Sequence, residues 1–105
     1  MATLYVTEYS GMAVVSQNSG LMLPSGNVAQ TPELVNQTVT ISGSPTSSQA
    51  FGKSTTLVRL HTDAICSVSF GSSPTSSGTT ARMVAGQTEY FGVVPNQVVS
   101  VITNV

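Results

Sequence analysis

The chain has 105 residues, which leaves room for one domain with one hydrophobic core. Only 7% of the residues are charged, against about 25% in an ordinary soluble domain, and the net charge is −1. Three basic residues are too few to neutralise a nucleic-acid backbone, no apolar run is long enough to form a membrane-spanning helix, and one cysteine excludes an internal disulfide.

Apolar and polar residues alternate along much of the chain, which is the pattern of half-buried β-strands. Val58 and Leu60, for example, share one face of such a run, while Arg59 and His61 lie on the other. No window shows helical periodicity. We therefore expect an all-β fold, an antiparallel β-sandwich or small barrel with a jelly-roll-like arrangement. The alternation predicts eight strands, near residues 3–9, 12–16, 35–42, 55–63, 65–71, 80–85, 88–94 and 97–104.

Residues 10–34 break the pattern, because they combine weak periodicity with many apolar side chains. Such a segment either folds over the domain as a loop or lies on a neighbouring subunit as an arm, and the rarity of long structureless loops favours the arm. The expected division is an N-terminal strand with an extended arm or loop at 1–34, and a β-sandwich core at 35–105. Contact residues are expected on the first strand and in this segment: Leu4, Tyr5, Val6, Tyr9, Met12, Leu21, Met22 and Leu23.

The motif Ser-Pro-Thr-Ser-Ser occurs twice, at residues 44–48 and 73–77. Serine, threonine and proline favour turns, so both copies are predicted to be flexible surface loops. The alternative interpretation is a duplicated hairpin unit, which a single repeat does not establish.

Few residues could carry chemistry. His61 and Asp63 could form a metal pair or an oriented base, but either role needs further partners, and an ordinary polar face is the favoured interpretation. Cys66 could be a thiol nucleophile with His61 as its base, yet it lies in an apolar run and is expected to be buried. No Gly-x-Ser-x-Gly motif supports a serine triad. We expect no catalytic residues, metal, cofactor or small-molecule substrate, and therefore no enzyme.

Five segments of the chain carry a resemblance to a known class of proteins: MATLYVTEY at 1–9, VRLHTDAICSVSFG at 58–71, SPT at 73–75, AGQTEYFGV at 85–93 and VSVI at 99–102. Together they resemble the small β-rich structural proteins encoded near the capsid genes of tailed bacteriophages. The resemblance covers both ends and most of the second half of the chain, and it is weak over residues 10–34. It implies a capsid decoration or cement protein that binds the major capsid protein on the outside of the virion.

Composition agrees with such a role. The polar surface is supplied mainly by 30 Ser and Thr residues, which give little charge repulsion between copies, so a homo-oligomer is expected. No secretion signal is evident at the N-terminus, which suggests synthesis in the host cytoplasm. Nucleic acid and membrane are not expected partners. The alternatives are a tail, neck or head-fibre component, or a module that binds host-surface glycans through its Ser/Thr-rich loops.

Overall fold

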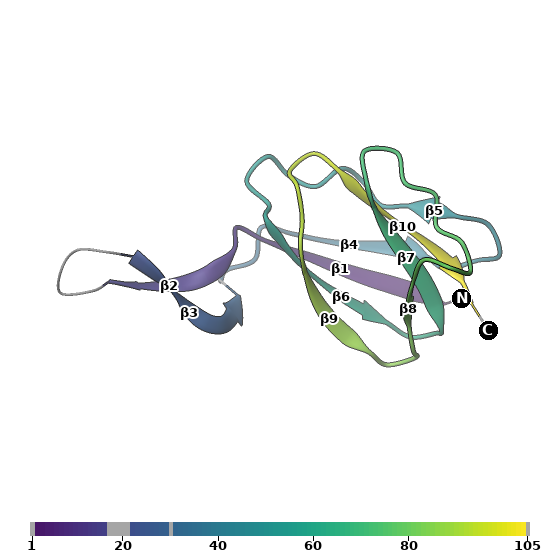
Figure 1. Ribbon diagram of the computed structural model, residues 1–105, viewed down its shortest axis with the longest axis horizontal. Coiled ribbons are helices and arrows are strands. Elements are labelled where there is room, and N and C mark those ends of the chain that lie inside the picture. Colours follow the sequence, from purple (N-terminus) through teal and green to yellow (C-terminus); the bar gives the residue numbers. More distant parts are fainter. Residues whose placement is uncertain (1, 17–21, 30, 105) are drawn as a thin grey trace.

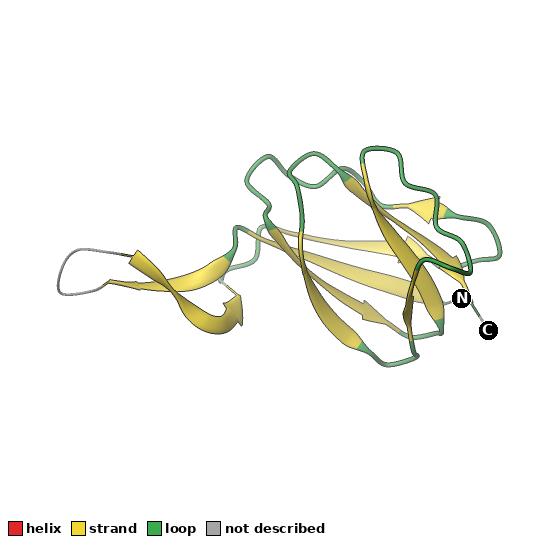
Figure 2. Cartoon of the chain, in the orientation of Figure 1, coloured by secondary structure: helices red, strands yellow, loops and turns green. Residues whose placement is uncertain are grey.

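The computed structural model describes residues 2–16, 22–29 and 31–104, and the side chains of residues 2–11 and 31–104. Two four-stranded antiparallel sheets, β4-β1-β6-β9 and β5-β10-β7-β8, face each other, and β2 and β3 form a separate hairpin (Figures 1 and 2). The predicted all-β sandwich is confirmed. No helix that could span a bilayer occurs in the described part of the chain.

The strands are β1 (Thr3–Tyr9), β2 (Met12–Ser16), β3 (Met22–Ala29), β4 (Val35–Thr40), β5 (Thr46–Ser47), β6 (Leu57–Thr62), β7 (Cys66–Gly71), β8 (Ala81–Met83), β9 (Thr88–Gly92) and β10 (Val98–Thr103).

The core lies between the two sheets and takes alternate residues from the facing strands. In β1, Leu4 and Val6 are 0% and 1% exposed, while Tyr5 between them faces outward. The prediction that Leu4 and Val6 contact a partner is therefore wrong, because both side chains are already buried within the domain. The buried apolar residues are Leu4, Val6, Val39, Ile41, Phe51, Val58, Leu60, Cys66, Val68, Met83, Val99 and Val101.

Strand β1 lies inside its sheet, between β4 and β6. Leu4, for instance, is opposite Val39 on one side and Thr62 on the other. The first strand is therefore part of the sandwich and does not belong with an arm, which corrects the expected division at residue 34.

The segment predicted to be a loop or arm forms a hairpin instead. Strand β2 pairs with β3, with an irregular register between Met12 and Val14, and the hairpin projects from the end of the sandwich opposite the two termini (Figure 1). Strand β3 was not expected because it contains Pro24 and Gly26. Both strands of a two-stranded ribbon are edges, where a proline is tolerated. Met12, Met22 and Leu23 lie on these strands, and Leu21 lies outside the described residues.

Both Ser-Pro-Thr-Ser-Ser segments lie largely at the surface, as expected, but each also anchors one serine on β10. The first copy contains β5, and the N–H of Val99 donates to the Oγ of Ser48 at 3.1 Å. In the second copy the Ser76 hydroxyl lies 2.9 Å from that of Ser100, and Ser76 is only 2% exposed. Each copy uses a different serine for its buried hydrogen bond, which gives no support to a duplicated unit.

Candidate functional site

The three tyrosines of the chain project from one surface, the outer face of the β4-β1-β6-β9 sheet, which we call the tyrosine face. Tyr5 and Tyr9 occupy the outward positions of β1, as the alternation predicts. Tyr90 reaches the same face because β9 pairs with β6, where it is opposite Arg59. Tyr5 and Tyr90 are 44% and 49% exposed, so the face presents large rings to a partner.

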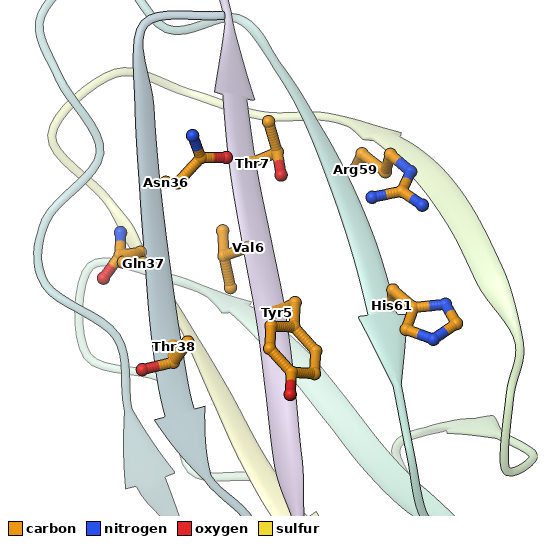
Figure 3. A pocket seen from close by; sticks show the side chains of 8 residues that line it. All are labelled: Tyr5, Val6, Thr7, Asn36, Gln37, Thr38, Arg59 and His61. Carbon is orange, nitrogen blue, oxygen red and sulfur yellow. The ribbon is translucent and has the colours of Figure 1, made fainter.

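A shallow groove of about 540 Å³ runs across this face (Figure 3). The register places the aromatic ring of Tyr5 between Thr38 of β4 and His61 of β6. Arg59 is the one basic residue among those that line the groove, and the carboxylate of Glu33 accepts a hydrogen bond from the lining residue Asn36 at 3.0 Å. The groove is lined by Tyr5, Val6, Thr7, Asn36, Gln37, Thr38, Arg59 and His61.

Two pairs of aromatic rings lie side by side on the tyrosine face. The centroids of Tyr5 and His61 are 6.2 Å apart, and the Nδ1 of His61 lies 2.7 Å from the Oγ1 of Thr88. Tyr9 and Tyr90 have centroids 6.4 Å apart. Burial raises the pKa of Tyr9, the nearby Tyr90 raises it further, and Arg59 opposes the shift. Tyr9 is therefore a neutral phenol near neutral pH, suited to contact and hydrogen bonding.

His61 and Asp63 do not form the pair considered from their spacing. The Oδ1 of Asp63 accepts the backbone N–H of Thr3 at 2.7 Å, so this carboxylate anchors the start of β1. His61 instead faces Tyr5 and Thr88. Within residues 2–16, 22–29 and 31–104, no group of three His, Cys, Asp or Glu side chains could hold a metal ion.

Cys66 is buried, as its apolar run predicts. Its Sγ donates to the Oγ1 of Thr62 at 3.5 Å, and burial raises the pKa of the thiol. The neutral thiol is a poor nucleophile. Cys66 faces the core from the second sheet, whereas His61 lies on the outer face of the first, so the structure does not bring the two together.

Glu8 is a buried carboxylate on β1, and no role was predicted for it from the sequence. Its side chain is 0% exposed and points inward from β1. The Oε1 atom accepts hydrogen bonds from the N–H of Gly52 at 2.9 Å and the hydroxyl of Thr55 at 2.8 Å, and the Oε2 atom accepts one from the Nε2 of Gln37 at 2.9 Å. These bonds tie β1 to β4 and to the loop before β6, so Glu8 is a structural residue.

Alternation along β1 predicts that Tyr5 and Tyr9 share a face, but it does not predict which residues surround them. Asn36, Arg59 and Tyr90 join the tyrosine face only through strand pairing, which local alternation does not specify. The signal that the sequence offered for these residues was their position on the outward side of each strand. No family model, curated protein or solved structure matches this chain.

Proposed function

We propose that this protein is a structural subunit of a phage virion, which attaches to another virion protein through the β2–β3 hairpin. The observation that carries the proposal is the position of the hairpin, which forms its own two-stranded sheet beyond the end of the sandwich (Figure 1). An isolated two-stranded hairpin is only marginally stable in water. Docking on a partner would add packing to such a hairpin.

The sequence of the hairpin supports attachment by apolar contact. No charged residue occurs between Glu8 and Glu33, so no charge has to be desolvated when this segment is covered. Several residues on β2 and β3 are apolar, including Met12, Val15 and Leu23. Both strands also have an open edge at which a partner strand could add.

The resemblance of the sequence to phage structural proteins supports the more specific proposal. In that role the protein decorates or cements the capsid exterior, with the major capsid protein as its partner. A tail, neck or head-fibre position remains the alternative within the virion. The number of copies per particle separates the two, with hundreds expected for a cement protein and a handful for a neck component.

Excision of the hairpin tests the attachment. Strands β1 and β4 are antiparallel neighbours, and the N–H of Leu34 donates to the carbonyl oxygen of Glu8 at 2.7 Å, so a short Asn-Gly turn can replace residues 11–32. We expect this variant to fold and to lose co-sedimentation with particles that lack the native protein. Tyr90→Ala, which leaves the hairpin intact, is the matched control and should still co-sediment. Full occupancy by the excised variant would refute attachment through the hairpin.

The groove on the tyrosine face favours a second candidate function, binding of a host-surface saccharide. An aromatic ring beside amide, hydroxyl and guanidinium groups can stack on a sugar ring and hydrogen-bond its hydroxyls. Because Ser48 and Ser76 already make buried hydrogen bonds, the groove is a better site than the Ser/Thr-rich loops.

A glycan array with the purified protein tests this second function. Binding should fall at least tenfold in Tyr5→Ala, whose ring lines the groove, and should persist in Tyr90→Ala, whose ring does not. The hairpin-excised variant should bind as well as the native chain. Absence of binding to any glycan would eliminate this candidate without affecting the attachment proposal.

A further inference from the structure

The two sheets of the sandwich leave four edge strands, which differ in how well they are protected against pairing. Strands β5 and β8 have only two and three residues. Strand β9 carries the charged residue Glu89, and a charge on an edge strand disfavours pairing with another strand. Strand β4 has six residues, Val-Asn-Gln-Thr-Val-Thr, with no charge, proline or glycine. Natural edge strands usually carry such protection, so β4 is the least protected of the four edges.

The hydrogen bonds of β1 show which backbone groups of β4 are free to pair. The N–H of Ile41 donates to the carbonyl oxygen of Ala2 at 3.0 Å, and that of Asp63 donates to the carbonyl oxygen of Thr3 at 3.3 Å. Even-numbered residues of β1 therefore bond toward β4, and odd-numbered residues bond toward β6. Bonding alternates along an antiparallel pair, so the odd-numbered residues of β4 bond to β1. The even-numbered residues, Asn36, Thr38 and Thr40, direct their N–H and C=O groups to the open edge.

We propose that two copies of this chain pair antiparallel through β4, with Thr38 of each copy opposite Thr38 of the other. In this register all three residues whose N–H and C=O groups point to the open edge take part in the pairing, since Asn36 of one copy then lies opposite Thr40 of the second. The side chains of these residues are exposed, and no like charges meet across the pair. The strand is thus complementary to itself, as a two-fold interface requires.

The pairing joins two four-stranded sheets into one continuous sheet, with a two-fold axis perpendicular to its plane. The axis keeps both tyrosine faces on the same side, where they form one extended surface. It also reverses the strand direction, so the two hairpins project from opposite ends of the dimer. If the hairpins attach to virion proteins, a step that rests on the proposed function, each dimer bridges two attachment points.

Mass measurement by sedimentation, across a range of concentrations, tests the dimer. The native chain should weigh twice 10.8 kDa, and Thr38→Ala should behave in the same way. Thr38→Pro removes a backbone N–H that points to the open edge of β4, and it should convert the protein to a monomer. Thr38→Lys places two ammonium groups across the axis and should weaken the dimer at least tenfold, more at low salt. A monomeric native chain would refute the proposal, as would a Thr38→Lys dimer of native strength; the lysine variant decides the matter if the proline variant fails to fold.

Cross-linking locates the interface. Thr38→Cys should be joined into a dimer by a short thiol-reactive cross-linker, whereas Thr88→Cys on the β9 edge should not, and the native Cys66 is buried. Efficient cross-linking of Thr88→Cys in place of Thr38→Cys would overturn the assignment to β4. The hairpin-excised variant should still dimerise while failing to attach, so failure of the dimer and failure of the attachment proposal give different results.

Discussion

A chain shortened to residues 35–105 is expected not to fold. The truncation removes β1, which is paired on both sides, and leaves β4 and β6 without their shared neighbour. It also removes Leu4 and Val6, each of which contributes about 1.5–3 kcal/mol by burial. Together with the lost backbone pairing, this loss is comparable with the whole stability of a small domain, about 5–15 kcal/mol. Circular dichroism should show no cooperative thermal transition.

The hairpin-excised chain is the matched control for this truncation. It retains β1 and every other strand of the two four-stranded sheets, so it should melt cooperatively within a few degrees of the native protein. A cooperative transition in the 35–105 fragment would show that the sandwich tolerates the loss of β1, and would contradict the central role assigned to that strand.

The strands themselves were predictable because alternation is a local property. All eight predicted segments contain a strand, and the first two have the expected bounds, Thr3–Tyr9 and Met12–Ser16. The inward and outward sides of β1 and β6 also follow from parity. Strand β5 was missed because a two-residue strand has no period to detect.

Strand order was not predictable, since it depends on pairing between residues far apart in the sequence. A first strand next to an apolar, irregular segment suggested an arm, and only the pairing with both β4 and β6 places it inside a sheet. The same limit applies to the candidate site. Parity placed Tyr5 and Tyr9 together, but the addition of Arg59 and Tyr90 required the register of three strands.

The burial of Glu8 illustrates how parity and residue type can conflict. The inward position follows from Leu4 and Val6, yet a carboxylate is seldom fully buried. The buried carboxylate is tolerated because β4 and the loop between β5 and β6 supply hydrogen-bond donors to it. No local pattern predicts that Gly52 and Thr55 will meet it.

Glu8→Ala is expected to lower the free energy of unfolding by about 3 kcal/mol or more. The substitution removes the acceptor of three buried or partly buried donors, on Gln37, Gly52 and Thr55. The Nε2 of Gln37 keeps a bond to the carbonyl oxygen of Gln49 at 3.3 Å, whereas the donors of Gly52 and Thr55 are left unpaired, and each unpaired buried group costs about 1–3 kcal/mol. Urea denaturation should show a lower midpoint with an unchanged slope. A variant as stable as the native chain would mean that water or a loop shift replaces these bonds at no cost.

Glu8→Gln separates the hydrogen bonds from the volume of the side chain. The amide oxygen can still accept from Gly52 and Thr55, but its NH₂ group then faces the Nε2 of Gln37. Gln37 cannot rotate its amide freely, because its Oε1 accepts the N–H of Gln49 at 2.9 Å. We expect a loss of about 1–2 kcal/mol, smaller than for alanine. The exchange Glu8→Gln with Gln37→Glu restores an acceptor opposite the new amide and should recover most of that loss, whereas purely additive effects of the two substitutions would show that this bond contributes little.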